Sequence, residues 1–119
     1  MSTVVRIRKR ADFLRVKDAK KSIATAGLVL QVAPTKDSNP ENPAIRLGFT
    51  ASSQVGNAVR RNRIKRRLRA AAREVVGKNA LPGNDYVIIG RFRAFDRHFG
   101  SLVKDLKYAL HNTGTFKKS

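Results

Sequence analysis

The side chains of this chain that could act chemically are concentrated in one run of cations. Residues 60 to 73 hold eight Lys or Arg residues and no acid. Guanidinium groups form paired hydrogen bonds with phosphate oxygens, and so many of them in one segment repel each other unless a polyanion neutralises them. Asn62 lies between two arginines, and its amide can both donate to and accept from a phosphate or a ribose. The chemistry indicated is recognition of a phosphate backbone.

The remaining polar residues do not form a pattern that indicates catalysis. The two histidines, His98 and His111, have no nucleophile motif beside them, and there is no cysteine. The eight acids are scattered without the spacing of a carboxylate pair or of metal ligands; they are Asp12, Asp18, Asp37, Glu41, Glu74, Asp85, Asp96 and Asp105. We therefore predict no catalytic residue and no metal site in the protein, and no cofactor bound by it.

Composition points to the same kind of partner. The chain has 119 residues, with 26 Lys and Arg against eight Asp and Glu, which gives a net charge of +18. A domain this basic usually binds nucleic acid. A membrane partner is not expected, because no apolar run is long enough to span a bilayer and no long helix pairs Lys or Arg with a face of Trp, Phe and Leu. The absence of cysteine suits a reducing compartment, and we expect a cytoplasmic protein.

The cations must be presented by a helix. Arg, Lys, Leu and Ala favour helices, and neither Pro nor Gly occurs from residue 58 to residue 76. Ile64, Leu68, Ala71 and Val75 share one apolar stripe at helical spacing, while most of the cations lie on the flanks and on the opposite side. The pattern predicts a helix that packs by one edge and leaves its cations accessible.

The other segments predict a single α+β domain over residues 1–119, built as a two-layer sandwich in the order α-β-β-β-α-β-α. Residues 1–5 are expected to be a loose tail. The expected elements are a helix at 9–19, an edge strand at 21–25, strands at 27–33 and 44–51, the basic helix from 57 to about 77, a strand at 85–92 and a helix at 95–111.

The start of the basic helix resembles a known family. The segment Gly56-Asn57-Ala58-Val59 followed by Arg61-Asn62-Arg63 closely resembles the signature of the bacterial ribonuclease P protein subunit. The similarity extends outward to the segments 10–13, 47–50 and 86–89, which match the family's first helix and the strands on either side of the signature. It covers nearly the whole chain.

This resemblance implies a left-handed crossover between the strands that flank the basic helix, against the general handedness rule. It implies the protein subunit of a ribonucleoprotein that removes the 5′ leader from precursor tRNA, with the chemistry performed by the RNA subunit and its Mg²⁺. The implied partners are ribonuclease P RNA and precursor tRNA, and no protein partner is expected. The implied contacts with the RNA subunit are Asn57, Arg60, Arg61, Asn62, Arg63, Lys65, Arg66, Arg67 and Arg69.

The resemblance also implies that a cleft of the protein, between the first helix and one face of the sheet, receives the single-stranded leader of the precursor tRNA. Phe13 matches the aromatic position of the cleft helix, and Val29 and Gln31 match the cleft face of a strand. This sequence departs from the family at Lys17 and Gln31, where many members have aromatic residues, and at Ser53-Gln54, where many have two lysines. Weaker base stacking is therefore expected, with backbone contacts through Lys17, Arg15 or Arg46 more important.

Two other classes of function fit a basic domain of this size. A structural RNA-binding protein of the ribosomal type would have the same composition. A DNA-binding module could place the basic helix in a major groove, although no helix-turn-helix partner precedes it. Selectivity for precursor over mature tRNA separates the ribonuclease P subunit from the structural RNA-binding protein. A tight preference for a DNA duplex over structured RNA would favour the DNA-binding module.

Overall fold

The computed structural model describes residues 3–117. Along the chain, its elements are β1 (Val4–Arg6), α1 (Arg10–Asp18), β2 (Ser22–Ala24), β3 (Leu28–Pro34), β4 (Ile45–Ala51), the 3-10 helix η1 (Ser53–Val55), α2 (Ala58–Asn79), β5 (Asn84–Gly90), the 3-10 helix η2 (Phe92–Phe95) and α3 (Phe99–Asn112). The predicted α+β class and the predicted order of helices and strands are confirmed. A short strand, β1, is added ahead of the first helix.

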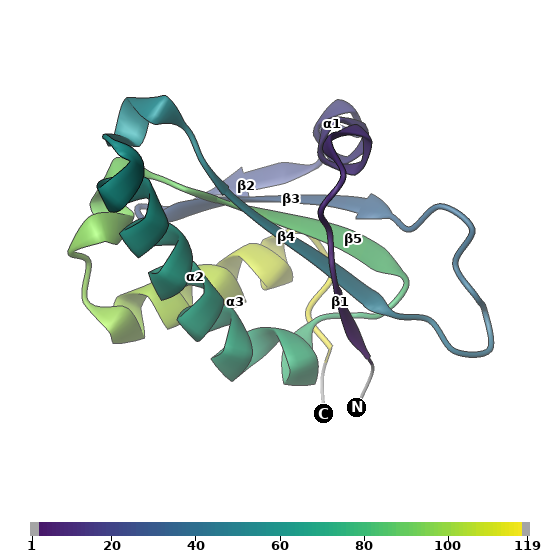
Figure 1. Ribbon diagram of the computed structural model, residues 1–119. Coiled ribbons are helices and arrows are strands. Elements are labelled where there is room, and N and C mark those ends of the chain that lie inside the picture. The colour runs from purple at the N-terminus through teal and green to yellow at the C-terminus, as the bar shows by residue number, and fades with distance from the viewer. Residues whose placement is uncertain (1–2, 118–119) are drawn as a thin grey trace.

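The five strands form one mixed sheet in the order β1-β4-β5-β3-β2. β4 is parallel to both of its neighbours, β1 and β5, while β3 is antiparallel to β5 and β2. Figure 1 shows α2 and α3 packed side by side on one face of the sheet and α1 on the other face. The sheet therefore separates the basic helix from the first helix.

The crossover from β4 through α2 to β5 is left-handed. β4 and β5 are parallel neighbours, and in Figure 1 both run toward the left, with β4 nearer the viewer and α2 beneath them. About 98% of such crossovers are right-handed. Hydrophobic spacing alone could not have predicted this exception, whereas the family resemblance implied it.

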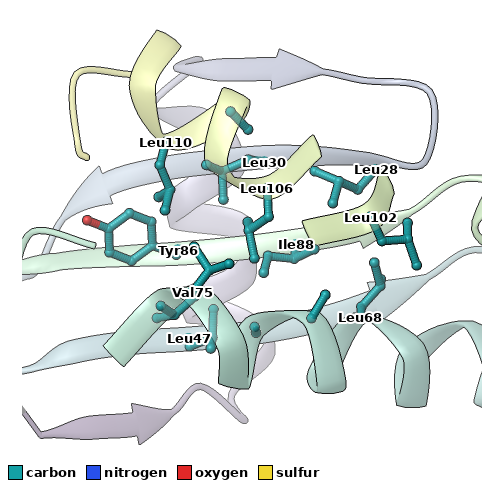
Figure 2. Close-up of a cluster of buried hydrophobic side chains, with 14 of the residues drawn as sticks. Leu28, Leu30, Leu47, Leu68, Val75, Tyr86, Ile88, Leu102, Leu106 and Leu110 are labelled. Carbon is teal, nitrogen blue, oxygen red and sulfur yellow. The ribbon is translucent and has the colours of Figure 1, made fainter. Parts of the chain in front are cut away.

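The main core fills the space between the sheet and the pair α2 and α3, as Figure 2 shows. The predicted stripe of α2 is buried throughout: Ile64, Leu68, Ala71 and Val75 are at most 1% exposed. Gly90 allows α2 to approach β5 closely, because a Cβ at this position would lie 2.3 Å from Cγ2 of Ile64. The burial of this stripe fixes which side of α2 faces solvent.

The structure corrects three of the predicted boundaries. Val4 and Val5 belong to β1, where they pair with Ile45 and Arg46, so the loose tail predicted for residues 1–5 is wrong at these two positions; residues 1 and 2 lie outside the described residues. A strand of three residues is too short to show an alternating pattern. α2 continues past residue 77 to Asn79. Phe92, predicted to end a strand, and Phe95, predicted to begin a helix, both belong to η2, and α3 begins only at Phe99.

Candidate RNA-binding surfaces

The first turn of α2 explains why Gly56 and Asn57 precede the cations. Gly56 has a φ of +132°, and a Cβ there would lie 2.3 Å from Cδ of Arg60. Asn57 is the N-cap residue, and its side-chain oxygen accepts a hydrogen bond of 2.9 Å from the backbone N–H of Arg60. These two residues fix where the helix begins and therefore which way each following cation points.

The outer side of α2 is an array of exposed polar side chains. Asn62, Arg63, Arg66 and Arg73 are exposed, and Arg61, Lys65 and Arg69 are half-buried. Within residues 3–117, every ion pair is formed by cations outside α2. The charge of α2 is therefore not neutralised by the protein itself, which leaves it available to phosphate groups.

Three arginines of α2 have partners in η2 and in the segment after it. Arg63 donates a hydrogen bond of 3.2 Å from Nε to the carbonyl oxygen of Phe95. The Arg60 guanidinium lies over the rings of Phe92 and Phe95, 4.3 and 4.0 Å from their centroids. Arg67 donates hydrogen bonds to the carbonyl oxygens of Ala94, at 2.5 Å, and Arg97. Burial, together with the neighbouring Arg63 guanidinium, lowers the pKa of Arg67. The sequence suggested one set of RNA-facing cations, but these three arginines also connect α2 with η2 and the segment after it.

On the opposite face of the sheet, the structure brings together Phe13, Val29 and Gln31. The Phe13 ring lies over Gly48, where an added Cβ would come within 2.8 Å of the ring. Val29 and Gln31 are half-buried on the face of β3 that α1 partly covers, and they pair with Ile89 and Val87 of β5. These residues form a partly apolar surface beside α1.

The two predicted cationic contacts on this side differ in their surroundings. Lys17 is exposed near the end of α1. Arg46 instead donates hydrogen bonds to Asp12 at 3.0 Å and to Asp85 at 3.2 Å. In the protein alone the Arg46 guanidinium is thus occupied by two carboxylates that connect α1 with the sheet.

Asp85 is the residue of this region that sequence reasoning missed. Its side chain is fully buried, yet it accepts hydrogen bonds from Arg15, Arg46 and the Thr35 hydroxyl, the last at 2.6 Å. The only signal in the sequence was an acid at the start of an otherwise apolar strand. Asp85 connects β5 with α1, β4 and the end of β3, and so positions the surface beside α1.

Neither a metal centre nor a membrane span is found in the described part of the chain. Residues 3–117 contain no group of three or more His, Asp or Glu side chains placed to hold a metal ion. No helix in this range is long and apolar enough to cross a bilayer.

Comparison with known proteins identifies the family. The family model described as Ribonuclease P matches residues 1–114. The chain belongs to the ribonuclease P protein family. Among curated ribonuclease P protein components, that of Paramagnetospirillum magneticum is 44% identical over 114 residues, which cover 96% of this chain and 86% of the relative. That of Ruegeria pomeroyi is 48% identical over 105 residues, which cover 87% and 82%.

Solved ribonuclease P proteins have the same fold. The Staphylococcus aureus protein is 32% identical, with a TM-score of 0.72, over 94% of this chain and 97% of that one. The Thermotoga maritima protein is 30% identical, with a TM-score of 0.69, over 85% and 90%. The two faces described above are therefore two faces of a ribonuclease P protein, the basic α2 on one and the surface beside α1 on the other.

Proposed function

We propose that this ribonuclease P protein is the non-catalytic subunit of an RNA-based endoribonuclease that matures the 5′ end of tRNA. It binds ribonuclease P RNA through the outer side of α2. It binds the single-stranded 5′ leader of precursor tRNA on the sheet face beside α1, through Phe13, Lys17, Val29 and Gln31, with Arg46 at one end. Cleavage is performed by the RNA subunit with its Mg²⁺.

The observation that carries this proposal is the unneutralised charge of α2. Eight cations lie between residues 60 and 73, and none of them pairs with a carboxylate in the described part of the chain. A folded array of this kind replaces diffuse counterions that two RNA molecules would otherwise need in order to approach each other. The protein should therefore matter most when Mg²⁺ is scarce.

The location of the two surfaces supports separate binding of the RNA subunit on α2 and of the leader beside α1. α2 and α1 lie on opposite faces of the sheet (Figure 1), so one RNA can occupy the basic helix while another segment lies beside α1. The second surface combines an aromatic ring, apolar side chains and an amide, a set that accepts unpaired bases. Arg46 would exchange part of its contact with Asp12 and Asp85 for a leader phosphate.

The test is cleavage of a precursor tRNA at limiting Mg²⁺. The ribonuclease P RNA is taken from an organism whose protein component is similar to this chain, such as Paramagnetospirillum magneticum. We expect the protein alone to be inert and the mixture to remove the leader at one site, much faster than the RNA alone. We also expect the bound complex to prefer precursor over mature tRNA. Binding to the RNA with neither acceleration nor this preference would contradict the proposal and favour a structural RNA-binding protein.

A further inference from the structure

A groove lies between the edge strand β1, its neighbour β4 and the C-terminal half of α2. Its volume is about 410 Å³, and its lining includes Val4, Arg6, Phe49, Arg69 and Arg73. Figure 1 shows β1 at the margin of the sheet. The strand β1 forms one side of the groove. The loose tail expected from the sequence would not have formed this side.

The floor of the groove is apolar and accessible. Side chains alternate along a strand, and Val4 and Arg6 pair with Ile45 and Leu47, whose buried side chains belong to the core beneath α2. Val4 and Arg6 therefore point to the α2 side of the sheet. Val4 is 46% exposed although it is apolar, and the Phe49 ring is half-buried beside it. Val4 and Phe49 together form an apolar surface that one face of a nucleobase can contact.

The walls of the groove are cationic without a counter-charge. The guanidinium carbons of Arg6 and Arg69 lie 5.5 and 5.9 Å from the centroid of the same Phe49 ring. Neither arginine forms an ion pair within residues 3–117, and the buried Nε of Arg69 has no hydrogen-bond partner there. Burial and the positive charges of Arg69 and Arg8 lower the pKa of Arg6. An anion in the groove would relieve this repulsion.

We propose that this groove binds one unpaired nucleotide of ribonuclease P RNA, a site that extends the proposed function and rests on it. The base lies on Val4 and Phe49, and the adjacent phosphate accepts hydrogen bonds from Arg6, Arg69 and Arg73. The nucleotide comes from the RNA subunit rather than the leader, because the groove is continuous with α2 and lies on the opposite face of the sheet from α1. A paired base could not present its face to this floor.

The first experiment uses the absence of cysteine from the natural chain. Val4→Cys and Leu14→Cys each introduce a single thiol, which is coupled to a short photo-activated cross-linker before assembly with ribonuclease P RNA. The two positions form a matched pair, because Val4 is 46% exposed in the groove and Leu14 is 44% exposed on α1, on the opposite face of the sheet. We expect Val4→Cys to cross-link to an unpaired nucleotide of the RNA subunit that Leu14→Cys does not reach.

The second experiment measures affinity for the RNA subunit as a function of salt. Arg6→Ala should weaken binding about tenfold, as for the loss of one charge-assisted contact, and lower the salt slope by about one. Arg8→Ala removes the same charge from an exposed position outside the groove and should change affinity about twofold or less. Circular dichroism of each variant checks that the fold is retained.

The outcomes separate the two proposals. If wild-type protein does not bind ribonuclease P RNA, the proposed function fails and the groove proposal fails with it. If wild-type protein binds, but Val4→Cys gives no cross-link to the RNA subunit or one to the leader, the groove proposal alone is overturned. Equal losses of affinity in Arg6→Ala and Arg8→Ala would also overturn it, because they would reflect overall charge rather than a site.

Discussion

At the scale of single residues, the cations of α2 differ in whether they contact the rest of the protein. Arg66 is exposed, and no carboxylate lies within ion-pair distance of it in the described part of the chain. Its neighbour Arg67 is half-buried and donates to the carbonyl oxygens of Ala94 and Arg97. One residue type in adjacent positions is thus available to a partner molecule in one case and contacts the rest of the protein in the other.

The pair Arg66→Ala and Arg67→Ala separates these roles. Arg66→Ala should weaken binding to ribonuclease P RNA and reduce the salt slope by about one, with the free energy of unfolding unchanged. Arg67→Ala should lower the free energy of unfolding by about 1–3 kcal/mol, because two carbonyl oxygens lose a charged donor. Urea unfolding and salt-dependent binding measure both quantities. A larger loss of stability in Arg66→Ala than in Arg67→Ala would contradict this division.

The sequence predicted the general position of these residues but not their contacts. Helical spacing placed the stripe of Ile64 and Leu68 inward and the cations elsewhere, because that periodicity is a local property. The partners of Arg67 lie 27 and 30 residues away, and no local pattern encodes such a contact. The sequence could not predict the carboxylate acceptors of Arg46 for the same reason. Arg46 was therefore expected to contact only the leader.

At the scale of elements, the first helix depends on buried charge as well as on apolar packing. The second apolar cluster has Ile7, Val16, Ala33 and Val87 as its buried members. Asp85 adds the ionic contacts with Arg15 and Arg46. Register explains the arrangement, because Arg46 and Asp85 are direct partners on the parallel strands β4 and β5. Pairing of strands 39 residues apart is decided by the tertiary fold.

Asp85→Asn should therefore loosen the attachment of α1. We expect a loss of about 2–3 kcal/mol in the free energy of unfolding, less than for a fully buried pair, because both arginines are partly exposed. The control Asp12→Asn removes a partly exposed carboxylate from the same cluster and should cost less than about 1 kcal/mol. Hydrogen exchange of α1 and urea unfolding test the pair. Equal, small effects would show that the apolar cluster alone holds α1.

At the scale of the whole molecule, a net charge of +18 on 119 residues gives salt two opposite effects. In the free protein, salt screens self-repulsion, because the Debye length falls from about 10 Å at 0.1 M to about 3 Å at 1 M. The thermal midpoint of the free protein should therefore rise with added NaCl. Binding to ribonuclease P RNA should weaken over the same range, because released counterions drive association.

The size of the loss of RNA affinity with added salt measures how many cations contact RNA phosphates. If the eight cations of residues 60–73 each neutralise one phosphate, affinity should fall by about 10³–10⁵ between 50 and 200 mM salt. Calorimetry of the free protein and filter binding of the complex across one salt series measure the two trends. Parallel trends would contradict the argument, because loss of affinity would then follow from unfolding. Opposite trends would show that the charge that destabilises the free protein is the charge that RNA neutralises.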